Sequence, residues 1–192
     1  MYAMHTHVHE SRKGFAHPER NVAVLGIKSG MSIADFGAGS GAYTFAIAEL
    51  LKINGRVYAI DVQRDLLRRI ANEAKRRGYE NVEIIWADLE APRASRLAEN
   101  SIDLVLVSNL LFQVPDKMPI MREARRIVKG GGHVAIIDWT DSFNGMGPIK
   151  EDVVKKEAAL KIAEKSDLSL VREFPAGTHH YGLLFKPIAP KI

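Results

Sequence analysis

The sequence contains no cysteine and no long apolar run. The missing cysteine excludes disulfides, thiolate metal sites and a cysteine nucleophile, and it suits a reducing cytosol. No apolar run approaches the roughly 20 residues that span a bilayer. The first ten residues, MYAMHTHVHE, lack the apolar core of a signal peptide. We therefore expect a cytoplasmic protein without a membrane span.

The chain has little net charge, +4 over 192 residues. Much of the basic excess lies in residues 64–77 and 122–129, which have the pattern of amphipathic helices with Arg and Lys on the solvent side. A nucleic-acid-binding surface needs such charges on one face. The sequence does not place the two segments together, so a nucleic-acid partner is not expected, although it stays open.

Strand and helix patterns alternate along what we expect to be one domain. The repetition predicts a mostly parallel sheet with helices on both faces. The predicted strands are residues 32–36, 56–61, 81–88, 102–109 and 133–139, and the predicted helices are 17–27, 42–53, 64–77, 116–129 and 149–163. Gly130, Gly131 and Gly132 are expected to end the helix before them.

The end of the chain breaks this alternation. Residues 168–174 and 179–187 are two further strands, joined only by PAGT, and so short a link predicts an antiparallel hairpin. The predicted fold is therefore α/β, with a mostly parallel seven-stranded sheet closed by an antiparallel C-terminal hairpin. We expect residues 1–17 to form a mobile arm and residues 18–192 to form the ligand-binding domain.

A glycine-rich stretch, ADFGAGSGAYT (34–44), follows the first strand and precedes a helix. It satisfies the fingerprint of a dinucleotide site such as that for NAD. A helix N-terminus offers free N–H groups to pyrophosphate, and equally to a carboxylate. Asp35 beside the loop would repel pyrophosphate and favour an ammonium group.

Two further acids end the second and third strands. Ligands of open α/β sheets bind at the carboxyl ends of the strands. Asp61 could accept hydrogen bonds from both ribose hydroxyls, and Asp88 could accept one from the exocyclic amine of adenine. The simpler alternatives are that Asp61 caps the next helix and that Asp88 begins a turn. Taken together, the acids indicate a ligand with adenine, ribose, an amino group and a carboxylate, which describes S-adenosylmethionine.

The segments IADFGAGSG, VYAID, IIWADLEAP, IDLVLVSNLLF and VKGGGHVAIIDW resemble, in order and spacing, the motifs of class I S-adenosylmethionine-dependent methyltransferases. The resemblance covers about residues 18–187 and implies the Rossmann-like fold of that family. It also implies roles for the cofactor-binding residues: Asp35 beside the loop, Gly37, Ala38 and Gly39 around the methionine part, Asp61 at the ribose, Val62 on adenine, Asp88 and the Leu89 backbone at the adenine amine, and Asn109 on the sulfonium and acceptor side.

The acceptor of the methyl group is less determined. Without cysteine, the covalent route to C5-methylcytosine is excluded, and SNLLF departs from the Asn/Asp-Pro-Pro-aromatic motif of enzymes that methylate base amino groups. No clear trio of metal ligands surrounds Asp138 or Asp141, so no metal is predicted. The chain most resembles small single-domain enzymes like the ubiquinone and menaquinone C-methyltransferases, which implies a small-molecule acceptor of unknown identity. An RNA or protein methyltransferase and a non-catalytic S-adenosylmethionine-binding protein remain alternatives, and the oligomeric state stays open.

A histidine pair, in THHYG (178–182), begins the last strand. Because that strand runs antiparallel, its start lies at the edge where the cofactor is expected. Histidine is the commonest general base. We predict His180 as the catalytic base rather than His179, because His180 shares a face with Gly182, which leaves room for a ligand. The alternative is that both histidines simply pack at the hairpin.

Overall fold

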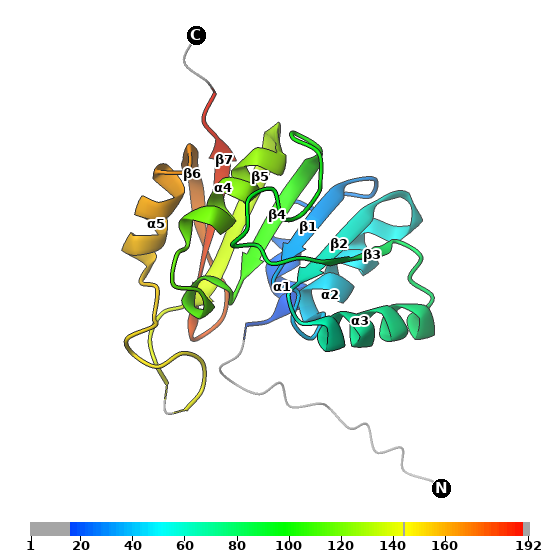
Figure 1. Ribbon diagram of the computed structural model, residues 1–192, viewed down its shortest axis with the longest axis horizontal. Helices are drawn as coiled ribbons and strands as arrows, with labels where there is room; N and C mark the ends of the chain where they lie inside the picture. The colour runs from blue at the N-terminus through cyan, green and yellow to red at the C-terminus, as the bar shows by residue number, and fades with distance from the viewer. Residues whose placement is uncertain (1–15, 144, 190–192) are drawn as a thin grey trace, which may run out of the picture.

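The computed structural model describes residues 16–143 and 145–189. Its centre is a seven-stranded sheet in the order β3-β2-β1-β4-β5-β7-β6 (Figure 1). Neighbours among β1 to β5 are parallel, and β7 is antiparallel to both β5 and β6. The strands are β1 Ser32–Phe36, β2 Arg56–Asp61, β3 Val82–Trp86, β4 Ile102–Ser108, β5 Val128–Trp139, β6 Leu168–Pro175 and β7 His180–Pro187. The predicted fold class is confirmed; the predicted arm, residues 1–17, lies almost wholly outside the described residues.

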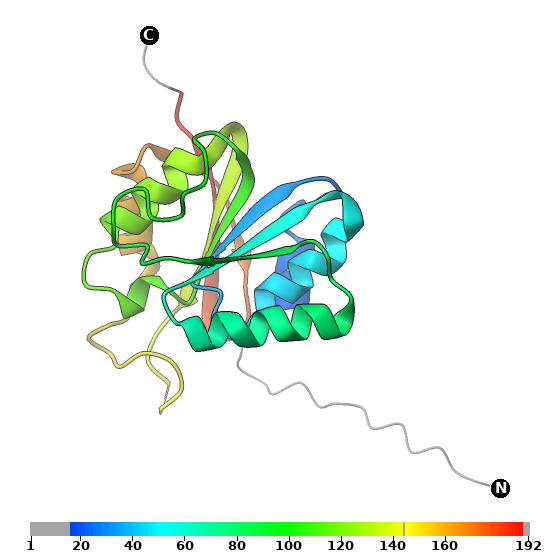
Figure 2. The ribbon, with the colours of Figure 1, turned by 45° about the vertical axis from the view of Figure 1, so that its right-hand side comes forward.

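Helices cover both faces of the sheet, as Figure 2 shows. The helices are α1 Pro18–Ala23, α2 Ala42–Leu51, α3 Arg64–Arg77, α4 Met118–Ile127 and α5 Lys156–Glu164, with 3-10 turns η1 Lys52–Asn54 and η2 Leu111–Gln113. The first three helices pack on one face, and α4 and α5 on the other. The two arginine-rich helices, α3 and α4, are therefore on opposite faces. Among the described residues, no helix combines the length and apolarity needed to cross a bilayer.

The central strands are buried on both sides. In β4, Leu104 and Leu106 face the cluster under α1 and α2, whereas Val105 and Val107 face the cluster under α4 and α5. Continuous apolar runs of this kind are typical of parallel strands covered by helices on both faces. The polar residues that follow these strands gather at the carboxyl edge of the sheet.

Three predicted helix boundaries were wrong. The first helix, predicted to run to residue 27, ends at Ala23. The helix expected from residue 149 begins only at Lys156, because the chain before it turns to bury Val154, whose carbonyl accepts a 2.9 Å hydrogen bond from the Tyr181 hydroxyl. The glycine triplet does not end α4 but forms an irregularity inside β5. A Cβ at Gly132 would lie 2.7 Å from the Asp103 carbonyl oxygen, so glycine permits this close approach of backbones.

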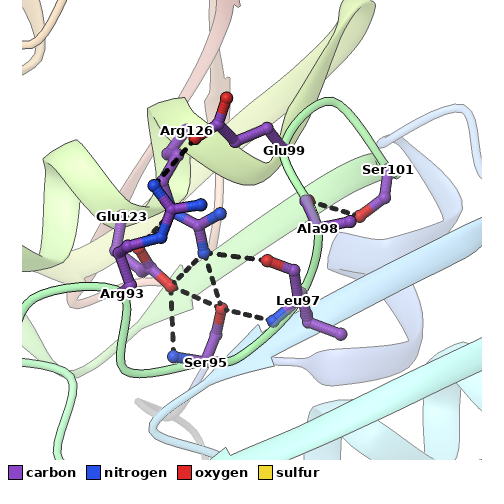
Figure 3. A network of polar contacts seen from close by, with 8 residues as sticks. All are labelled: Arg93, Ser95, Leu97, Ala98, Glu99, Ser101, Glu123 and Arg126. Carbon is purple, nitrogen blue, oxygen red and sulfur yellow. Dashed lines mark hydrogen bonds and ion pairs between the residues drawn. The ribbon is translucent and has the colours of Figure 1, made fainter.

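The connection from β3 to β4, residues 87–101, has no α-helix and is held on α4 by a polar network (Figure 3). The Glu123 carboxylate accepts hydrogen bonds from both the backbone N–H and the hydroxyl of Ser95. Arg126 donates to both oxygens of Glu123, at 2.8 and 2.7 Å, and to the Leu97 carbonyl at 2.9 Å. Because the connection begins with Asp88 and Leu89, the network anchors one side of the site described next.

Candidate functional site

The glycine loop between β1 and α2 brings backbone close to two neighbours. Gly37 has φ +70°, and a Cβ there would lie 2.9 Å from Cδ1 of Leu110. Gly41 is the N-cap of α2 with φ +83°, and a Cβ there would lie 2.9 Å from the Ile70 side chain. Positive φ is accessible to glycine at no steric cost. The loop therefore presents backbone rather than side chains to the cavity beside it.

Asp61 ties the end of β2 to this loop. Its Oδ2 accepts a 2.9 Å hydrogen bond from the Gly39 N–H, and its Oδ1 accepts a 2.8 Å bond from the Gln63 N–H. The N-cap of α3 is Gln63, and its side chain makes no capping bond. Asp61 thus lies two residues before the N-cap, so the helix-cap alternative does not describe its place.

A cavity of ≈ 140 Å³ lies between the loop and the ends of β2 and β3. This volume is below the roughly 300 Å³ of a typical pocket for a whole ligand, so the walls would enclose only part of a nucleoside-sized molecule. Six predicted residues line the cavity: Gly37, Gly39, Asp61, Val62, Asp88 and Leu89. Val62 and Asp88 are exposed, whereas Leu89 is buried.

Asp35 and Ala38 are not among the lining residues. The Asp35 carboxylate is buried and accepts a 2.6 Å hydrogen bond from the Thr44 hydroxyl in the first turn of α2. Burial raises the pKa of Asp35 to about 6, the Thr44 hydrogen bond partly opposes this, and Asp61 adds to it. The Ala38 N–H donates to the Ile60 carbonyl at 3.0 Å. Asp35 and Ala38 therefore stabilise the loop through contacts with the rest of the protein, away from the cavity.

Asn109 follows β4 in the left-handed region, with φ +51°. Its N–H donates to the Ile137 carbonyl at 2.8 Å, and its carbonyl accepts a bond from the Gln113 amide. It does not line the cavity, although its neighbours Leu110 and Gln113 do. Asn109 therefore shapes the turn that forms one cavity wall, at the sheet edge next to the glycine loop.

His180 lies two strands further along the same edge, paired with Trp139 in the β5–β7 register. The two rings lie 4.3 Å apart between centroids. Burial, and to a lesser degree the charge of His179, lowers the pKa of His180 to about 4. His180 lines a separate hollow of ≈ 560 Å³ that also contacts Thr140 and Phe174. The structure therefore does not bring His180 into the glycine-loop cavity.

Asp138 is the remaining buried acid at this edge, and it is 1% exposed. Burial raises its pKa to about 7, although the backbone N–H groups of Trp139, Leu111 and Phe112 favour the charged form. Asp138 thus lies between β5 and η2, the turn that carries a wall of the cavity.

Buried polar atoms without a hydrogen-bond partner are concentrated at the carboxyl ends of β4 and β5 and at the start of β7. Among the described residues, seven buried side-chain N or O atoms have no hydrogen-bond partner, and five of them follow one another along the ends of β4, β5 and β7. They are Ser108 Oγ, Asn109 Oδ1, Asp138 Oδ2 and both ring nitrogens of His180. An unsatisfied buried group costs about 1–3 kcal/mol. Buried groups of this kind are normally satisfied by an ordered water, an ion or a ligand.

Sequence reasoning missed several residues that shape the cavity. Among them, Leu110 directly before η2 and Gln113 at its end follow Asn109 and line the cavity. They could have been found because they lie within a few residues of the end of β4, at the same edge. Trp86 ends β3 immediately before the lining residues Ala87 and Asp88. The feature that could have identified Trp86 from the sequence is a large aromatic residue at the end of a predicted strand.

Comparison with known proteins gives one family. A family model described as a methyltransferase domain matches residues 27–177. A demethylmenaquinone methyltransferase from Listeria welshimeri is 28% identical over 167 residues, which cover 82% of this chain and 69% of that protein. One from Bacillus velezensis is 27% identical over 121 residues, which cover 62% of this chain but only 50% of that protein. The chain thus spans between half and about two thirds of these relatives.

A solved structure agrees with the family match. The crystal structure of a SAM-dependent methyltransferase from Aquifex aeolicus superposes with a TM-score of 0.81 at 25% sequence identity, covering 90% of each chain.

Proposed function

This chain belongs to the methyltransferase domain family, and on that premise we propose that it transfers a methyl group from S-adenosylmethionine to a small-molecule acceptor. The observation that carries the proposal is the position of Asp61, which joins the glycine loop to the end of β2 beside a cavity. Its bond to Gly39 occupies an N–H group that a pyrophosphate bound to this loop would need. The same carboxylate suits the hydroxyl groups of a ribose.

The residues that line the cavity suit contact with part of the adenosine of S-adenosylmethionine. The rim of the cavity carries two carboxylates, Asp61 and Asp88, which suit two ribose hydroxyls and an adenine amine. Val62 and Leu89 supply apolar contact for a flat base. The Gly37 N–H already donates to the Ile60 carbonyl at 2.9 Å, so Gly37 contributes its lack of a side chain beside the ligand rather than a free donor.

When bound, the cofactor supplies both the methyl group and the leaving sulfur, so the chain's main task is alignment. Alignment of this kind can supply about 7–11 kcal/mol of a barrier. The unpartnered Asn109 Oδ1 and Ser108 Oγ lie next to the glycine loop. We propose that the acceptor binds there, over the ends of β4 and β5, and satisfies these atoms.

His180 is our candidate for the base, if the acceptor must lose a proton. Two strand spacings of about 4.8 Å separate it from β4, so it lies roughly 10 Å along the edge. Its lowered pKa keeps the imidazole uncharged at neutral pH but also makes it a weak base. Once an acceptor is identified, turnover of His180→Ala and His179→Ala between pH 6 and 8 distinguishes the two histidines. Full turnover of His180→Ala would assign the base elsewhere.

A small molecule is favoured over a nucleic acid by the position of the basic helices. The arginines of α3 and α4 lie on opposite faces of the sheet, so they do not form one continuous basic surface. The names of the two relatives, which denote methylation of a menaquinone precursor, also favour a small molecule.

Calorimetry with S-adenosylhomocysteine and with NAD tests the cofactor. We expect the first to bind and the second to bind far more weakly. Asp61→Ala should weaken S-adenosylhomocysteine binding about tenfold to a hundredfold, because hydrogen bonds to a charged group contribute about 1.5–3 kcal/mol each. The matched control is Asp65→Ala, an exposed acid on α3 that pairs only with Arg68. Tighter binding of NAD, or an unchanged affinity in Asp61→Ala, would overturn the proposal.

A further inference from the structure

We propose that Trp86 is a positioning residue for adenine recognition, which sets the gap between the two apolar walls of the cofactor cavity. Trp86 ends the edge strand β3 and is 46% exposed. It does not line the cavity. The inference rests on the proposed function, because it assumes that adenosine occupies the cavity.

The Trp86 side chain joins the two walls directly. Its indole Nε1–H donates a 3.0 Å hydrogen bond to the carbonyl of Val62, in the turn between β2 and α3. Its own backbone leads straight into Ala87, Asp88 and Leu89 on the opposite wall. A rotation of the indole would therefore shift Val62 relative to Leu89.

A second hydrogen bond joins the end of β2 to the segment that follows β3. The Ala87 N–H donates to the Asp61 carbonyl at 3.1 Å. This bond joins the backbones at the ends of the two strands, whereas the indole bond joins the Trp86 side chain to the turn after β2. With both in place, the spacing of Val62 and Leu89 is set before a ligand arrives. Such preorganisation raises affinity by reducing the ordering that binding requires.

One arginine contacts the indole ring, and a second contacts the backbone of Trp86. The Arg64 guanidinium carbon lies 3.8 Å from the centre of the Trp86 ring. A cation over an indole face contributes about 0.5–1 kcal/mol at an exposed site. Arg96 donates a 3.2 Å hydrogen bond to the Trp86 carbonyl. An aromatic residue that merely covered the sheet edge would need neither contact, nor the bond to Val62.

The test uses Trp86→Phe, which keeps an aromatic ring for Arg64 but removes the N–H donor. Calorimetry measures the Kd of S-adenosylhomocysteine and of methylthioadenosine, which has the adenosine but lacks the amino-acid part. Loss of one hydrogen bond should raise both Kd values by the same factor, about 3- to 10-fold. The matched control is Tyr79→Phe, which removes a hydroxyl bonded to Glu49 away from the cavity and should change neither Kd.

Three outcomes separate the possibilities. Equal affinity of wild type and Trp86→Phe for methylthioadenosine overturns the inference while leaving the proposed function intact. Failure of the wild type to bind S-adenosylhomocysteine overturns the proposed function, and the inference with it. Loss of affinity only in step with a lowered urea midpoint would make Trp86 a structural residue and also overturn the inference.

A fluorescence experiment gives an independent readout. The chain has two tryptophans, so Trp139→Phe leaves Trp86 as the sole emitter. Titration of this variant with methylthioadenosine should shift or quench the emission, because the base fills the gap that Trp86 spans. Saturable binding by calorimetry without a change in emission would count against the inference.

Discussion

The substitution Arg126→Met should be strongly destabilising, because it leaves a buried carboxylate without its cation. The Glu123 side chain is 3% exposed and that of Arg126 15% exposed. Removing one partner of a buried ion pair costs about 3–5 kcal/mol, since the other charge stays buried. A domain of this size has about 5–15 kcal/mol of stability, so the variant should fold but with a much lower urea midpoint.

The pH dependence of this loss has a definite sign. Burial alone raises the pKa of Glu123, but the hydrogen bonds from Arg126 and Ser95 outweigh it and hold the pKa below its usual value. In the wild type the ionised Glu123 therefore contributes stability above its unfolded pKa of about 4.5, and this is lost at lower pH. The penalty of Arg126→Met should be largest near pH 7 and should shrink toward pH 4, because the buried Glu123 that has lost its cation in the variant takes up a proton as the pH falls.

Urea unfolding followed by circular dichroism measures these differences. Arg122→Met, on the exposed side of the same helix, is the control and should change stability by less than about 0.5 kcal/mol. The double variant Glu123→Leu/Arg126→Met should recover part of the loss, but not all, because the Ser95 N–H and the Leu97 carbonyl also lose their partners. A loss below about 1 kcal/mol in Arg126→Met would refute the reasoning from a buried pair.

Three further variants have defined outcomes. Asp138→Asn should stabilise the ligand-free protein at pH 8 but not at pH 4. The reason is that a buried carboxyl with its pKa raised to about 7 destabilises the folded state once the pH rises through that value. An equal effect at both pH values in urea unfolding would contradict this. His180→Phe should raise the free energy of unfolding by about 1 kcal/mol, because it removes an unsatisfied imidazole. The gain should grow from pH 7 to pH 5, because His180 of the wild type takes up a proton in the unfolded state before it does so in the folded state. A lower urea midpoint would show that the imidazole has a partner. Gly37→Ala should lower the free energy of unfolding by about 1 kcal/mol, because alanine disfavours φ +70°. It should also weaken S-adenosylhomocysteine binding in calorimetry. Unchanged stability would mean that the loop relaxes.

The mostly parallel sheet, its antiparallel C-terminal hairpin and the convergence of Asp61 and Asp88 could be predicted from sequence, because they depend on period and connection length. Alternating segments make parallel strands, and parallel strands place their carboxyl ends at one edge. The boundary of α5 could not be predicted in this way. Its start depends on the burial of Val154 and on the Tyr181 bond to it, which join segments 27 positions apart in the chain. No local sequence pattern in residues 149–155 predicts that contact.

Which acid reaches the cavity was harder to predict than which acids lie at the edge. Asp35 is the last but one residue of β1, so its side chain points to the face covered by α2, where Thr44 meets it. Asp61 is the last residue of β2, where the chain already turns toward α3. A difference of one residue relative to the strand end therefore separates a buried acid from one that lines the cavity. Strand ends are the least certain feature of sequence-based prediction.

The unpartnered atoms along β4, β5 and β7 link the stability predictions to the site. Replacing Asp138 or His180 by a less polar residue should stabilise the protein, whereas residues that only support the fold should destabilise it when altered. A fold selected for stability alone would not hold polar atoms without partners in adjacent positions of one edge. A fold that must receive an acceptor next to a methyl donor gains from them, because each atom satisfied on binding returns its desolvation cost as affinity. If the acceptor binds as proposed, we expect the edge between Asn109 and His180 to be where stability and function oppose each other in this chain.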